Sequence, residues 1–192
     1  MKLLHSLVLL LVILCSIANF LKSAHGAELY HGRVIDEETG EPIAGAVLTV
    51  VWYTTPIISM ERGMSFLSAQ ETLTDSDGKF LLLAEPAIDW NPFTIVRKPP
   101  DTVVIYKPGY VPLEPGSPAW KQVASFGSTH KALQKGPTIK LPKLKDKEEA
   151  WRFSNLGAFA ITDVPYDKIP KLLKAVNVQR ELIGLQLYPE KN

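Results

Sequence analysis

Short runs of β-forming residues alternate with Gly- and Pro-containing turns through most of this chain, from about residue 28 to about residue 144. One run, 46–54, is almost wholly apolar, which is typical of a central strand covered on both faces. No helical period lies between the runs, so the pattern favours an antiparallel sandwich over βαβ units. We therefore expect a mainly β protein, an antiparallel Greek-key β-sandwich of about seven strands. The predicted strands are 28–36, 46–54, 71–75, 79–84, 102–113 and 137–144.

Two segments are long for connections in such a sandwich, 53–70 and 114–130. Loops of this length in a compact domain are usually functional or lack a fixed conformation. We expect both to be loops, the second with a turn of helix around Ala119–Val123. Contacts with a partner are expected from these two segments and from 85–101.

The character of the chain changes after residue 145 and predicts a small helical C-terminal extension, 145–192. A charged helix start precedes Trp151 and Phe153, which are candidate packing residues. Further on, four apolar residues recur at the spacing of one helix face. These four are Ile169, Leu172, Leu173 and Val176. Asn177 is expected to end this helix, before a short second piece at Gln179–Leu185.

The first 26 residues have the features of a secretory signal peptide. Lys2 precedes the largely apolar run Leu3–Phe20, and the small residues Ala24 and Gly26 favour cleavage before Ala27. The alternative is an uncleaved membrane anchor, because the apolar run is close to the length that spans a bilayer. The sequence therefore predicts an exported protein, periplasmic or secreted, that contacts a membrane only if this segment stays attached.

Cysteine usage and charge exclude several classes of function. Cys15 is the only cysteine, so the chain after the predicted leader has no disulfide and no thiolate for catalysis or zinc binding. The chain carries 21 basic and 20 acidic residues, and Lys2 and Lys22 lie in the leader. This near-neutral balance argues against nucleic acid as a partner.

Three stretches in the strand region resemble the carboxypeptidase regulatory-like domain, a family with a transthyretin-like β-sandwich. They read "GRVIDEETGEPIAGAVLTV" at 32–50, "TLTDSDGKFLL" at 72–82 and "YKPGYVPL" at 106–113. The resemblance implies one sandwich domain at 27–144. The residues that carry its structural motif include Asp36, Gly40, Pro42, Gly45, Asp75, Asp77, Gly78 and Phe80.

The chain departs from the family pattern in two places. The insertion at 53–70 lies inside the motif, and the segment after residue 145 has no counterpart in the family. Because this sandwich hosts several functions, the resemblance implies the fold and leaves the activity open.

The acidic turn Asp75-Ser76-Asp77-Gly78 has the spacing that begins a calcium loop, but also that of a hairpin turn. A calcium loop needs a late carboxylate, and the following residues "KFLLLA" contain none. We therefore expect a hairpin, in which Asp75 and Asp77 accept backbone N–H groups, Gly78 takes a positive φ and Phe80 faces the core.

The sequence shows no other recognisable arrangement for catalysis or metal binding. His31 and His130 are the histidines outside the leader, and neither has a partner that the sequence reveals. There is no Gly-x-Ser-x-Gly motif and no cluster with metal-ligand spacing. We expect no catalytic residue, no metal and no cofactor, although an enzyme with an unrecognised site stays open.

The sequence thus predicts a non-catalytic exported β-sandwich module, an accessory or protein-interaction domain of the cell envelope or extracellular space. Its partner would be an envelope or extracellular protein, or a carbohydrate. The alternative is a carbohydrate-binding module that uses aromatic side chains in loops, above all Trp90 and Trp120, because exposed aromatic faces stack on sugar rings. Packing in the core is the competing interpretation for these aromatics.

Overall fold

The structure is a computed structural model that describes residues 27–190 except 58–62, 86, 92, 97–101, 125–127, 160 and 162. The predicted signal peptide lies outside the described residues. Within the described part of the chain, no helix combines the length and the apolar character needed to cross a bilayer.

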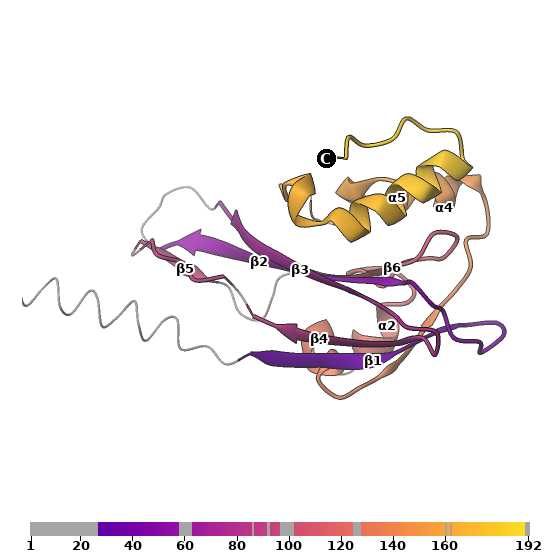
Figure 1. Cartoon of the computed structure of the whole chain (residues 1–192), viewed down its shortest axis with the longest axis horizontal. Coiled ribbons are helices and arrows are strands. Elements are labelled where there is room, and N and C mark those ends of the chain that lie inside the picture. The colour runs from indigo at the N-terminus through magenta and orange to yellow at the C-terminus, as the bar shows by residue number, and fades with distance from the viewer. Residues whose placement is uncertain are drawn as a thin grey trace, which may run out of the picture.

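The described residues form seven strands in two facing sheets, so the prediction of a mainly β sandwich with a helical C-terminal extension is confirmed (Figure 1). In the first sheet β1 lies between β4 and β7; in the second, β2 pairs with β3 on one side and with β5 and β6 on the other. The first sheet comprises β1 (Glu28–Asp36), β4 (Lys79–Ala84) and β7 (Thr138–Leu141). The second comprises β2 (Val47–Pro56), β3 (Ser65–Leu73), β5 (Thr94–Val96) and β6 (Thr102–Tyr106).

One strand pair departs from the antiparallel expectation. β7 runs parallel to β1, with Arg33 opposite Thr138 and Asp36 opposite Leu141. Parallel neighbours require a crossover connection rather than a tight turn. The chain between β1 and β7 includes the whole second sheet, so no tight turn joins this pair. Its last part, from β6 to β7, contains two short helices, α2 (Lys121–Ala124) and α3 (Thr129–Leu133). The predicted turn of helix near Ala119–Val123 corresponds to α2.

The prediction of a loop over 53–70 is wrong. β2 continues to Pro56 and β3 begins at Ser65, so both ends of this segment extend an antiparallel pair, with a register shift at Trp52/Tyr53. The predicted strand 102–113 is shorter than expected, because β6 ends at Tyr106 and the chain then turns. β5 pairs with the last residues of β2, Thr54–Pro56, and so adds hydrogen bonds to the extended part of the β2–β3 pair.

β2 is buried on both faces, as the apolar run predicts. One face contributes Leu48, Val50 and Trp52 to a core between the two sheets. The other face contributes residues such as Val47 and Val51 to a second core beneath the C-terminal helices. The molecule therefore has three layers, with the second sheet in the middle (Figure 1).

The helical layer consists of four short elements on the outer face of the second sheet (Figure 1). They are α4 (Lys147–Arg152), η1 (Leu156–Phe159), η2 (Tyr166–Lys168) and α5 (Pro170–Leu182). The predicted apolar stripe of α5 is buried in the second core, and so is Phe153. Trp151, the other candidate packing residue, is 58% exposed because it lies on the solvent face of α4.

The prediction that the helix ends at Asn177 is wrong, because α5 continues without a break to Leu182. Most of the predicted second piece, Gln179–Leu185, is therefore the last part of α5. The Asn177 side chain is buried, its amide nitrogen donates to the Tyr188 carbonyl at 3.0 Å, and its oxygen accepts the Tyr188 N–H at 2.8 Å. These bonds satisfy the amide group inside the helix, so it does not compete with the helix backbone.

The N-terminus of α5 obtains its hydrogen-bond acceptor from the sheet. Its own N-cap residue, Ile169, has no side-chain acceptor, whereas the carboxylate of Glu71 in β3 accepts the backbone N–H groups of Lys171 at 2.8 Å and Leu172 at 2.9 Å. The Thr49 hydroxyl also donates to Glu71, at 3.1 Å. Burial raises the pKa of Glu71, while these bonds oppose that shift. The helix is thereby fixed to the sheet by polar as well as apolar contacts.

Candidate functional site

Asp36 is the most highly connected carboxylate of the sandwich. It ends β1 and is only 4% exposed. Oδ1 accepts the backbone N–H groups of Glu38 at 2.8 Å and Thr39 at 3.1 Å. Oδ2 accepts the Tyr110 hydroxyl at 3.0 Å and lies 3.3 Å from Lys143 Nζ. The backbone bond from Thr39, above all, lowers the pKa of Asp36 to about 2, against the opposing effect of burial.

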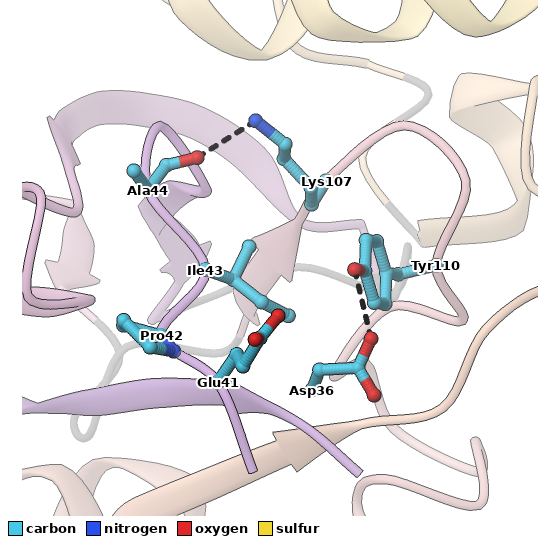
Figure 2. A pocket seen from close by; sticks show the side chains of 7 residues that line it. All are labelled: Asp36, Glu41, Pro42, Ile43, Ala44, Lys107 and Tyr110. Carbon is cyan, nitrogen blue, oxygen red and sulfur yellow. Dashed lines mark hydrogen bonds between the residues drawn. The ribbon is translucent and has the colours of Figure 1, made fainter. Parts of the chain in front are cut away.

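A hollow of about 260 Å³ lies beside Asp36. Figure 2 shows Asp36 and Tyr110 on one side of it and Ala44 and Lys107 on another. Lys107 Nζ donates to the Ala44 carbonyl at 2.7 Å. Burial, and then the bond to Asp36, raise the pKa of Tyr110. The hollow is lined by Asp36, Glu41, Pro42, Ile43, Ala44, Lys107 and Tyr110.

The chemistry of this hollow is that of a structural junction. A carboxylate with four hydrogen-bonding partners and a pKa near 2 is a weak base at neutral pH. Lys107 and Tyr110 each donate a hydrogen bond to another residue of the fold, Lys107 to the Ala44 carbonyl and Tyr110 to Asp36. Asp36 and Tyr110 lie 74 positions apart in the sequence, so their bond joins β1 to the turn that follows β6.

The motif residues of the sequence analysis gather at this same end of the sandwich, here called the turn end: the turns at 36–46, 74–79 and 107–110. The backbone N–H of Val34 donates to the Gly78 carbonyl at 2.8 Å, and that of Ile43 donates to the Val34 carbonyl at 3.0 Å. Thr74 Oγ1 accepts the Ala46 N–H at 2.8 Å and donates to the Ile43 carbonyl at 2.7 Å. The Gly45 N–H also donates to the Thr74 carbonyl at 2.9 Å, so the turn that contains Gly40, Pro42 and Gly45 is hydrogen-bonded to the segment that leads into the Asp75–Gly78 turn.

The Asp75–Gly78 turn is present, but it is not a hairpin of one sheet. β3 before it pairs with β2, whereas β4 after it pairs with β1 in the other sheet. Asp75 Oδ1 accepts the backbone N–H groups of Asp77 at 2.9 Å and Lys79 at 2.8 Å, as expected for a closed turn. The chain passes from one sheet to the other at this turn, because β4 pairs with the edge of β1. In this position Phe80 lies in the core between the sheets.

Gly78 occupies a position that only glycine fits. Its φ is 73°, and a Cβ there would lie 2.3 Å from the Val34 carbonyl oxygen. Gly40 has the same φ of 73°, but a Cβ there would meet nothing within 4 Å. Among the described residues, no group of three or more His, Cys, Asp and Glu side chains is arranged to hold a metal ion.

The two histidines lie in separate packing environments. His31 is half-buried, its Nδ1 has no hydrogen-bond partner, and its ring packs so closely on Gly136 that a Cβ there would lie 2.6 Å from Nε2. His130 Nδ1 lies 2.9 Å from Ser128 Oγ, and burial lowers the pKa of its ring.

The two tryptophans proposed for sugar binding do not form one surface. Trp120 is half-buried against the core between the sheets, and its Nε1 donates to Thr129 Oγ1 at 3.1 Å. Trp90 is 76% exposed in the segment between β4 and β5. Figure 1 shows β5 well apart from α2, which directly follows Trp120.

Trp90 belongs instead to a cluster of exposed apolar residues at the end of the sandwich remote from the turn end, here called the apolar end. Pairing brings its segments together: Thr94 lies opposite Pro56, and the backbone N–H of Ile57 donates to the Phe93 carbonyl at 2.8 Å. The apolar end comprises Ile57, Met64, Ile88, Trp90, Phe93 and Ile95, each between 48% and 76% exposed.

The sequence pattern does not reveal the apolar end as a unit. It predicts loops at 53–70 and 85–101, and nothing in it relates the apolar residues of one segment to those of the other. The available signal was the number of large apolar side chains in segments expected to be solvent-exposed. Their proximity depends on the pairing of β5 with β2, which brings together residues about 40 positions apart.

No family model, curated protein or solved structure matches this chain. The carboxypeptidase regulatory-like resemblance therefore stays a prediction, and the site must be interpreted from its own geometry.

Proposed function

We propose that this protein is an exported, non-catalytic binding module of the cell envelope or extracellular space, and that it makes its contacts through the apolar end. The observation that carries the proposal is the clustering there of exposed aromatic and aliphatic side chains, with Trp90 and Phe93 at 76% and 68% exposure. Single exposed apolar residues are common, whereas several of them on adjoining segments are typical of an interaction site.

The composition of the apolar end supports binding. Tryptophan is among the side chains that contribute most of the binding free energy in many interfaces. The strands beneath them are paired on both sides, since β2 lies between β3 and β5 there. The part of the patch on β5 and at the end of β2 is thus carried by paired strands, which reduces the ordering that contact requires.

The turn end supports the non-catalytic part of the proposal. Asp36 is held anionic by bonds that also fix the surrounding turns, and Lys107 and Tyr110 are bonded to the fold. A catalytic acid or base needs a pKa near the working pH and a free path to substrate. A hollow lies beside Asp36, but the pKa of this carboxyl group is about 2 and both of its oxygens already accept hydrogen bonds from the fold.

A photo-cross-linking experiment in the exporting cell tests the proposal. A photoreactive phenylalanine analogue replaces Phe93 in one variant and Trp151 in a matched control, because Trp151 is also an exposed aromatic but lies in α4. We expect discrete adducts from position 93 and none from position 151. Equal labelling from both positions, or none from position 93, contradicts the proposal.

The carbohydrate alternative has its own readout. Affinity electrophoresis in polysaccharide gels should show no retardation that depends on Trp120, because this side chain is half-buried and hydrogen-bonded to Thr129. Retardation that both Trp90→Ala and Trp120→Ala abolish would favour a sugar site over the apolar end.

A further inference from the structure

The N-terminal segment joins the sandwich in the half that carries the apolar end, level with the middle of β2 rather than with Pro56. β1 begins at Glu28, which lies opposite Ala84, the last residue of β4. The chain passes from β4 directly into the segment that carries Ile88, Trp90 and Phe93. Figure 1 shows the start of β1 and the whole of β5 toward the same end of the long axis.

The chain that precedes Glu28 contains an apolar stretch, Leu3–Phe20, close to the length that spans a bilayer. Only the short spacer Leu21–Gly26 separates this stretch from the described residues. A fully extended spacer of this size reaches about 20 Å. A chain held in the membrane by Leu3–Phe20 therefore keeps the start of β1 within about 20 Å of the bilayer surface. The apolar end extends beyond the start of β1 toward the same end of the molecule, so it can reach that surface.

We propose that the apolar end docks onto a lipid bilayer, with Trp90 and Phe93 inserted at the membrane–water interface. This inference rests on the proposed function and names the partner of the same surface. Aromatic side chains concentrate at this interface, where an indole ring keeps its N–H hydrated while its apolar part is buried.

Two of the described carboxylates near the patch are held in a way that permits docking. The Asp89 carboxylate is turned into its own loop, where it accepts the backbone N–H of Asn91 at 3.0 Å and the Thr94 hydroxyl. Glu85 is bonded through its backbone to Gln70, which lies opposite Val50, well back along β2 from Pro56. Neither carboxylate therefore has to enter the interface with the aromatic rings.

The docking surface can be tested apart from the anchor. All core residues of the described fold lie at Tyr30 or later, so a chain that starts at Ala27 contains both cores. This chain and the full chain are mixed with vesicles of phosphatidylcholine and phosphatidylglycerol, with and without brominated acyl chains. Tryptophan emission and co-sedimentation are measured.

We expect brominated vesicles to quench the emission of the chain from Ala27, and Trp90→Ala to remove that quenching. The double variant Trp90→Ala/Phe93→Ser should bind vesicles about tenfold more weakly or worse. Trp151→Ala is the matched control, since Trp151 is exposed on α4, and it should bind and be quenched as the unaltered chain is. Binding should survive about 0.5 M salt, because the contact is apolar rather than ionic.

The absence of quenching at Trp90 in both chains overturns the inference, as does an equal loss for Trp151→Ala. These outcomes leave the proposed function testable on its own. Protein adducts from position 93 without vesicle binding would keep the binding module and assign a protein partner instead. Loss of position-specific adducts and of vesicle binding together would reject both proposals.

Discussion

The two ends of the sandwich differ in the side chains that they present and in the bonds that those side chains make. At the turn end, buried polar groups such as Thr74 and Asp36 bond across three turns. At the apolar end, large side chains such as Trp90 and Phe93 face solvent. The contrast shows that the residues most characteristic of the sequence motif make bonds within the fold, while the contact surface that we propose consists of residues outside the motif.

The largest effect on stability is expected from Gly78→Ala at the turn end. The change combines a strained positive φ with a Cβ 2.3 Å from the Val34 carbonyl oxygen. We expect a loss of about 3 kcal/mol or more in the free energy of unfolding, measured by urea denaturation. Gly40→Ala has the same φ without the clash and should lose only about 1 kcal/mol. Equal losses of stability for Gly78→Ala and Gly40→Ala would show that the contact between a Cβ at position 78 and the Val34 carbonyl oxygen costs no stability.

Thr74→Val should have the next largest effect. The Thr74 hydroxyl is buried and links the Ala46 N–H to the Ile43 carbonyl, and valine has the same shape without these bonds. Leaving both backbone groups without a partner should cost about 2 kcal/mol in urea denaturation. Thr39→Val is a control, because Thr39 is exposed, and it should change stability by less than about 0.5 kcal/mol.

The pH dependence of stability should carry the signature of Asp36. Its pKa in the folded protein is about 2, below the ordinary value of 3.8, so its contribution is full above pH 3.8 and is lost as the pH falls toward 2. Thermal melts across this window should show a shallower acid decline for Asp36→Asn than for the unaltered chain. Parallel declines would mean that the bonds from Thr39 and Tyr110 do not hold the charge.

The smallest effect on stability is expected at the apolar end. Trp90→Ser and Phe93→Ser remove side chains that are already exposed, so unfolding free energies should stay within about 0.5 kcal/mol of the unaltered chain. A loss as large as that of Thr74→Val would mean that these side chains pack in solution. Such a result would remove the contrast between the two ends.

The sequence by itself determined the features that depend on local pattern. The apolar run of β2 predicts burial on both faces, and the spacing from Ile169 to Val176 predicts the buried stripe of α5. Likewise, "DSDG" predicts a turn with Gly78 at positive φ. These predictions succeed because the side-chain period and the backbone preference of each residue act within a few neighbouring positions.

Only the tertiary structure decided which partners those elements find. β4 leaves β3 to pair with β1, β7 joins β1 in parallel, and Glu71 binds a helix that begins about 100 positions later. The same packing buries half of Trp120 and leaves Trp90 in solvent. Each outcome depends on contacts between strands and faces that lie far apart in the chain. The stable arrangement is the one that buries the most apolar surface while every buried backbone N–H and C=O group keeps a hydrogen-bond partner.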